Sequence, residues 1–279
     1  MPAGEARVRL AALQQALTRL GAAPLGATRR EILVGYQELE LALDWDQAQA
    51  LEPEAAAETV IELAAQVRAA ESDWEAVAPS LLPVLWGRGE AADLARRAPN
   101  LLAWPWAEEL VLTVAQGTPL GRRYLGRDDC PGGAAVALAA ALENLRGRTP
   151  TEAVTAVGAE GQPLYGLACD DGLESSRLLL GTDLLPAFAA NGLIGAAPAR
   201  EMLSFAPFCA AGCRHLRELV NLAANGAASL PFALSSNLFY LSPEGVLRLT
   251  VEATPDGPRL HLPEALALRQ ARLAADGRW

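Results

Sequence analysis

The sequence contains no lysine, because all 23 basic residues among its 279 are arginine. This absence excludes a Schiff-base lysine and the lysine of a phosphate-binding loop. Enzyme classes that depend on either group are therefore excluded. We attribute the lack of lysine to GC-rich coding of an alanine- and leucine-rich chain rather than to function.

Cysteine and histidine are also scarce, with four and two residues respectively. Four unevenly spaced cysteines do not form a disulfide framework, which favours a reduced, cytoplasmic protein. A serine hydrolase site using His215 or His261 is not favoured, because the sequence has no G-x-S-x-G motif. The glycine-rich segments "CPGGAA" and "VGAEG" match neither nucleotide-binding fingerprint. We therefore predict no cofactor and favour a protein that is not an enzyme.

Neither an excess of positive charge nor a long apolar run is present. The net charge is −10 and the sequence pI is about 4.8. An acidic surface repels phosphate backbones, and no stretch of about 18 uncharged apolar residues predicts a membrane span. The first 20 residues have the pattern of an amphipathic helix rather than of a signal peptide. The predicted partner is an unknown protein or small molecule, neither nucleic acid nor membrane.

With 51% hydrophobic residues, the chain can bury a large core. Neighbouring strands are predicted in pairs, with helices between the pairs, which favours an α+β fold with mixed or antiparallel sheets covered by helices. We expect one domain over residues 1–279, or two lobes over about 1–75 and 80–279. Helices are expected at about 5–20, 47–70, 131–145, 173–190, 209–225 and 263–274. Strands are expected in "EILVGY", "LELALDW", "LLPVLWG", "EELVLTVAQG", "LIGAAPAREMLSFAPF", "PFALSSNLFYLS" and "GVLRLTVEA", and a hairpin in residues 152–172 with its turn at Glu160 and Gly161.

Two cysteines and a histidine lie close together in "FCAAGCRHLREL". On a helix, Cys209 and Cys213 share one face with three apolar residues further along, which is typical of a core stripe. His215 would then lie on another face, in solvent. The alternative is a structural zinc site, which would need Cys130 and Cys169 as the other two ligands.

The densest polar cluster is "CDDGLESSRLL". Its carboxylates suit a divalent cation, and its serines and arginine suit a phosphate or carboxylate. In this hypothesis Asp171 and Glu174 hold an ion, while Arg177 and Arg200 bind an anionic ligand with Asn144 beside them. The alternative is structural, because Asp171 followed by Glu174 resembles a capping box at the start of a helix.

The segment "AWPWAEE" carries two of the six tryptophans, Trp104 and Trp106. Two aromatic residues around a proline can form a groove for a ligand or partner. More often such a segment packs a loop against the core. The sequence leaves open whether these rings are exposed.

Several segments in order resemble one family. They are "LLPVLWGRGEAADLARRAPNLLAWPWAEELVLTVAQ", "RRYLGRDDC" followed by "ALENL", "DGLESSRLL", "GAAPAREMLSFAP" and "LPFALSSNLFYLSPEGVL". Together they are similar to the YtpQ-like bacterial family over about residues 5–250. Leu173, Ser175 and Glu201 depart from that family's pattern of an aromatic residue, an alanine and an aspartate. The resemblance implies fold class and solubility, and it carries no activity.

Three functional hypotheses remain. The first is a cytoplasmic, non-enzymatic protein that binds a partner or small ligand, and it is the one we favour. The second is an enzyme or metal-dependent ligand binder centred on "DDGLESSR". The third is a structural zinc protein that uses Cys130, Cys169, Cys209 and Cys213.

Overall fold

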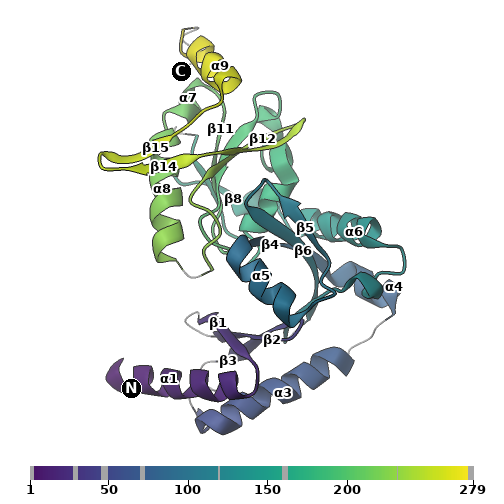
Figure 1. Cartoon of the computed structure of the whole chain (residues 1–279). Coiled ribbons are helices and arrows are strands. Elements are labelled where there is room, and N and C mark those ends of the chain that lie inside the picture. Colours follow the sequence, from purple (N-terminus) through teal and green to yellow (C-terminus); the bar gives the residue numbers. More distant parts are fainter. Residues whose placement is uncertain are drawn as a thin grey trace. The chain divides into compact units, whose positions relative to one another are not determined.

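A computed structural model of the chain describes residues 3–27, 31–44, 50–69, 73–118, 120–158, 163–230 and 232–275 (Figure 1). Two compact units share these residues. Unit 1 comprises residues 1–83, 89–103 and 113–144, and unit 2 comprises residues 84–88, 104–112 and 145–279. Residues beyond position 80 thus contribute to both units, and the expectation of one domain or two lobes stays a prediction.

The α+β prediction is confirmed. Among the described residues, one sheet has seven strands in the order β1-β2-β3-β7-β6-β4, with β5 paired to β6, and a second has six in the order β13-β12-β10-β11-β9-β8. The pairs β2–β3, β6–β7, β10–β12 and β12–β13 are all antiparallel. The strands of the first sheet are β1 (Ala23–Ala27), β2 (Glu31–Tyr36), β3 (Leu39–Asp44), β4 (Leu81–Gly87), β5 (Ala103–Trp106), β6 (Leu110–Thr118) and β7 (Gly121–Tyr124).

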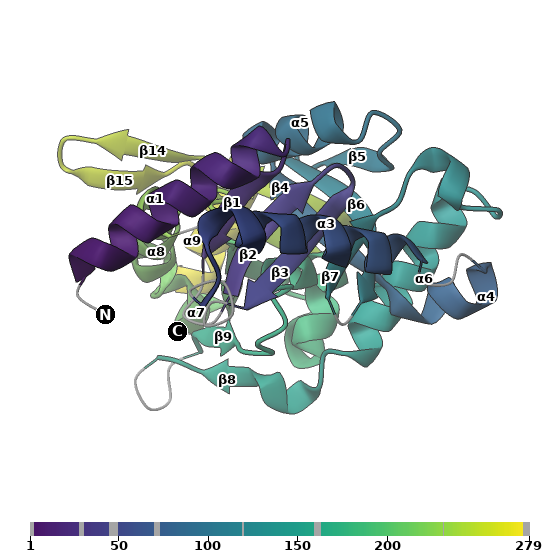
Figure 2. The same ribbon diagram turned by 90° about the horizontal axis from the view of Figure 1, so that it is seen from below.

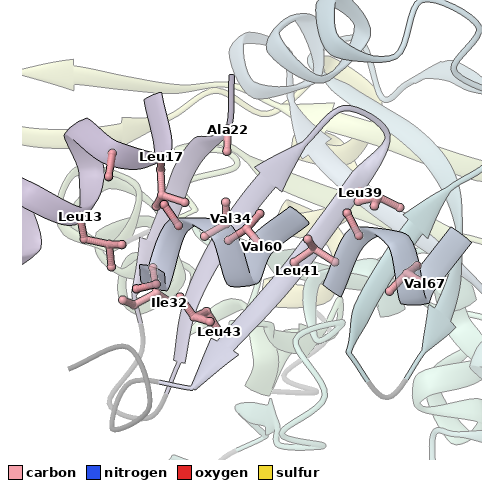
Figure 3. Packing of buried hydrophobic residues seen from close by; sticks show 14 residues of the cluster. Leu13, Leu17, Ala22, Ile32, Val34, Leu39, Leu41, Leu43, Val60 and Val67 are labelled. Atoms are coloured by element: carbon pink, nitrogen blue, oxygen red, sulfur yellow. The ribbon is translucent and has the colours of Figure 1, made fainter. Parts of the chain in front are cut away.

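Two long helices cover one face of strands β1 to β3 in unit 1 (Figure 2). They are α1 (Ala3–Arg19) and α3 (Pro53–Ala69), and α3 begins at a proline, which suits the first turn of a helix. Alternate residues of β2 and β3 point toward these helices, because successive side chains of a strand face opposite sides of the sheet. Figure 3 shows the resulting core, which includes Leu13, Leu17, Ile32, Val34, Leu39, Leu41, Leu43, Val60 and Val67.

The remaining helices of unit 1 include α6 (Ala134–Gly147), which the sequence predicts about three residues too early. Helix α4 (Trp74–Val77) is a single turn before β4. Helix α5 (Arg88–Arg97) follows β4, and its last residue, Arg97, donates a hydrogen bond to the Gln37 carbonyl.

Unit 2 is built on the six-stranded sheet. One face of it packs against α7 (Ala210–Cys213), α8 (Leu216–Ser229) and α9 (Glu264–Ala275). A two-stranded ribbon of β14 (Val251–Thr254) and β15 (Gly257–Leu260) lies against α8 (Figure 1). The strands of the sheet are β8 (Val154–Ala156), β9 (Tyr165–Leu167), β10 (Leu193–Ala196), β11 (Ser204–Pro207), β12 (Leu238–Ser242) and β13 (Gly245–Leu249). Strands β8 and β9 form the predicted hairpin, whose predicted turn at 160–161 lies outside the described residues.

Two helix predictions in unit 2 are wrong. The expected helix at 173–190 is a pair of 3-10 segments, Ser175–Leu184 and Pro186–Phe188, and Gly181 interrupts the first with a φ of 58°. The expected helix at 209–225 breaks at Arg214 and His215 and then continues to Ser229. In both places tertiary packing overrides the local helical pattern.

Candidate functional site

Arg177 lies at the centre of the segment that the sequence favours as a site. Its side chain is fully buried in unit 2. Two of its nitrogens donate to the Oδ1 and Oδ2 atoms of Asp171, both at 2.8 Å. Its Nε donates to the Thr149 hydroxyl at 2.8 Å, and Nη2 also donates to the Arg148 carbonyl at 3.0 Å. This guanidinium therefore ties the segment to residues 148–149.

The charge of Arg177 is balanced inside the protein. Burial alone would lower the pKa of the guanidinium, but the hydrogen bonds and charge of Asp171 outweigh burial and raise it. A bidentate arginine–carboxylate pair is among the strongest hydrogen-bonded pairs in proteins. An anionic ligand would have to displace Asp171 to reach Arg177, so Arg177 stabilises the fold rather than binding a ligand. We call Arg177 with its bonds to Asp171, Arg148 and Thr149 an internal brace.

Glu174 and the two serines after it are buried around the same segment. Glu174 Oε1 accepts a hydrogen bond from the Cys169 amide at 3.2 Å, and Asp171 Oδ1 accepts one from the Leu173 amide at 3.1 Å. The predicted capping box is thus wrong, because each carboxylate binds a different amide and Glu174 makes no cap bond. The Ser176 hydroxyl accepts from the Leu85 amide at 3.1 Å. Within the described residues, Glu174 Oε2 and the Ser175 hydroxyl have no hydrogen-bond partner.

Arg200 is buried between two aromatic rings. Its guanidinium carbon lies 4.3 Å from the ring centre of Trp86 and 4.7 Å from that of Phe232. Cation–π contacts of this kind stabilise a desolvated guanidinium. The Arg200 carbonyl accepts a hydrogen bond from the Ser175 amide at 3.0 Å, so its backbone adjoins the "DGLESSR" segment. Phe232 has a φ of 54°, which is rare for a bulky residue.

Asn144 belongs to unit 1, whereas the other four predicted ligand-binding residues belong to unit 2. Its side-chain amide donates to the Ala78 carbonyl at 2.8 Å and to the Leu81 carbonyl at 2.9 Å. These bonds hold α6 against the start of β4. Of the predicted set, the structure joins Asp171 to Arg177 directly, and Ser175, the residue after Glu174, donates to the Arg200 carbonyl.

The four cysteines are all free thiols. Cys209 precedes α7, and its sulfur accepts from the Gly212 amide at 3.4 Å. Burial, with the neighbouring Cys209 thiol, raises the pKa of Cys213 to about 11. Among the residues that the structure describes, which include every cysteine, no three His, Cys, Asp or Glu side chains are grouped to hold a metal ion. The zinc hypothesis gains no support from this arrangement.

The expectation that His215 is solvated is wrong. The residue is buried, and its Nδ1 lies 2.8 Å from Glu218 Oε2. It occupies the N-cap position of α8, so the break after Cys213 turns the ring inward. The second histidine, His261, lies on the surface with its Nε2 at 2.7 Å from Glu252 Oε2. Each histidine therefore faces a carboxylate.

The edges of the sheets show a second kind of candidate site. Unpaired N–H and C=O groups at a sheet edge can pair with another chain, and proteins usually protect such edges with proline, bulges, charges or short strands. Strand β1 has Pro24 and a shift in register, β8 has three residues, β5 has Pro105, and β4 is buried along its length. In the ribbon, exposed charges and Pro258 serve the same purpose.

Strand β13 is the exception among the described edges. It has five residues, Gly245–Leu249, no proline and a regular register with β12. No described strand pairs with its other side. Every second residue of an antiparallel edge strand points its N–H and C=O away from the sheet. Leu247 is 41% exposed on this strand and Val246 is half-buried. We call this side of the strand the β13 edge.

The one charged residue of β13 is neutralised within the chain. Arg248 lies 3.2 Å from Glu108 Oε2 and 3.6 Å from Glu109 Oε2. Glu109 also accepts hydrogen bonds from the Ser235 hydroxyl and the Asn237 amide, the latter at 2.5 Å. The β5–β6 turn that carries both glutamates is thereby fixed beside β13.

The tryptophans of "AWPW" are both half-buried, which resolves the question left open by the sequence. The Trp106 ring lies 5.6 Å from the ring of Phe239 on β12. Both rings belong to unit 2, so Trp106 packs against the core of that unit rather than forming an open groove.

The sequence did not identify the β13 edge. The segment "GVLRLTVEA" predicts a strand, but the position of a strand within its sheet depends on contacts that are distant in sequence. A signal that could identify such an edge is a strand that, unlike the other edge strands, has no proline and whose only charged residue is paired within the chain.

The chain matches no protein-family model, and no curated protein or solved structure is similar to it at a significant level. The resemblance to the YtpQ-like family therefore stays a prediction. No described helix has the length and apolar character needed to cross a membrane.

Proposed function

We propose that this protein is a non-enzymatic interaction protein that binds an extended segment of a partner protein by strand addition at the β13 edge. In this mode the added segment pairs its backbone with an exposed sheet edge, and pockets beside the edge select its side chains. Strand addition is supported by the β13 edge itself, which exposes Leu247 and lacks the proline, the register shift, the three-residue length and the complete burial found at β1, β4, β5 and β8.

Side chains that could take part in catalysis are instead bonded to each other or buried, which supports a binding role. Arg177 and Asp171 bind each other, and burial raises the pKa of the thiol of Cys213. A nucleophile needs an adjacent base or a lowered pKa to act in catalysis. In this proposal the segment "DDGLESSR" stabilises unit 2 and is not the centre of an enzyme or metal-dependent binding site.

We place this activity in the cytoplasm. The four cysteines are free, and the acidic composition favours a protein that stays in solution.

In-cell photo-crosslinking tests the proposal. A benzophenone amino acid replaces Leu247 in one variant and Ile61 in a matched control, because Ile61 is 42% exposed but lies on α3. We expect a discrete adduct at Leu247 and none of the same mass at Ile61. Loss of that adduct when Val246 is also replaced by lysine would support contact along the strand. No adduct at Leu247, or the same adducts at both positions, would contradict strand addition.

A further inference from the structure

The charges around the β13 edge indicate the chemistry of the segment that it binds. Glu108 is 71% exposed and shares Arg248 with Glu109. Glu244, at the turn before β13, is fully exposed. The charge of Arg269 also acts on Glu244. Three carboxylates and two guanidiniums, those of Arg248 and Arg269, therefore lie around the edge, which leaves an excess of one negative charge.

Glu244 stays ionised at neutral pH. Hydrogen bonds from the Ser242 hydroxyl and from its own backbone lower the pKa of this carboxyl. The whole chain also has a net charge of −10. Such a field attracts basic partners, accelerates their approach and repels acidic ones.

We infer that the segment added to the β13 edge alternates apolar residues with arginine or lysine. The apolar residues would pack beside Leu247, whose side chain is exposed at the edge. The basic residues would face Glu108 and Glu244. This inference rests on the proposed function and adds the class of partner.

A second copy of this chain fits the edge less well. Two copies would bring the same carboxylates together and add two net charges of −10. The inference therefore commits to a basic segment of a different protein.

Two synthetic peptides test the inference. They share the same valine residues at alternate positions and differ only at the positions between, which are arginine in one peptide and glutamate in the other. We expect the arginine peptide to bind about 10-fold more tightly at low salt, because two added ion pairs at a protein surface account for a difference of that order. The advantage should shrink as the salt concentration rises.

Variants separate the inference from the proposed function. Leu247→Lys should abolish binding of the arginine peptide, whereas Glu108→Gln combined with Glu244→Gln should remove only its advantage. Equal binding of both peptides at the β13 edge would overturn the basic-segment inference and leave strand addition standing. If Leu247 crosslinks to a partner in cells but neither peptide binds the purified protein, the inference would also be overturned. A stable dimer that Leu247→Lys dissociates would overturn it too, since a second copy would then fill the edge.

Discussion

Replacing Arg177 by methionine tests the assignment of this residue as an internal brace. Methionine keeps much of the length of the stem and removes the guanidinium with its four hydrogen bonds. Removing one partner of a buried ion pair typically costs about 3–5 kcal/mol of folding stability. Asp171 is 29% exposed and can be solvated, so we expect the lower end, about 3 kcal/mol.

The reverse substitution, Asp171→Asn, should cost at least as much. It leaves a fully buried guanidinium without its carboxylate, which water cannot easily reach. In the double variant the two losses overlap, and we expect a coupling free energy of about 2 kcal/mol between the two side chains.

Urea denaturation followed by tryptophan fluorescence measures these free energies of unfolding. The matched control is Arg146→Met, because Arg146 is 53% exposed and pairs with Asp183 on the surface of the same unit. An exposed pair contributes about 0–1 kcal/mol. If Arg177→Met lowers the free energy of unfolding by no more than this control does, Arg177 does not act as an internal brace and is available to a ligand.

Three further predictions concern other parts of the chain. Gly121→Ala should destabilise unit 1 by about 3 kcal/mol or more, since φ is +140° and the added Cβ would lie 2.1 Å from the Glu40 carbonyl oxygen; a urea midpoint equal to that of the wild type would contradict this. The buried Cys213, whose pKa is raised to about 11, should resist alkylation at pH 8 in the folded protein and react in urea; rapid labelling of the folded protein, read by peptide mass spectrometry, would refute its burial. Burial would raise the pKa of Glu38, but hydrogen bonds from Arg68 and its own backbone lower it, so the stability that Glu38 contributes is present at neutral pH and lost as the pH falls below about 4.5. Glu38→Gln should therefore reduce the fall in melting temperature at acidic pH. An unchanged fall would count against a stabilising Glu38–Arg68 pair.

Local patterns predict most of the elements. The alternation in "EILVGY" and the turn residues around "LLPVLWG" place β2 and β4 correctly. The helix expected at 47–70 is found as α3, which begins at Pro53, where proline is well tolerated in the first turn. Strand β1 was missed, because "APLGA" contains a proline and a glycine, which weaken the strand pattern, and pairing with β2 overrides that weakness.

The candidate site could be predicted only in part. The sequence identifies "DDGLESSR" as an unusual polar cluster, and its second half, which includes Glu174, Ser176 and Arg177, is buried in unit 2. Such a cluster can bind a ligand, or its side chains can bind other residues of the chain. Which of the two occurs depends on partners distant in sequence, such as Thr149, that no local pattern reveals. The β13 edge is harder still to predict, because it is defined by where a strand lies in its sheet.

Hydrogen exchange of the β13 backbone shows whether a partner strand pairs with this edge. The measurement compares the free protein with its complex with the partner that crosslinks through Leu247. We predict that alternate amides of Gly245–Leu249 exchange markedly more slowly in the complex, because the added strand accepts hydrogen bonds from the outward-facing N–H groups. Protection confined to other surfaces, with exchange in β13 unchanged, would contradict strand addition.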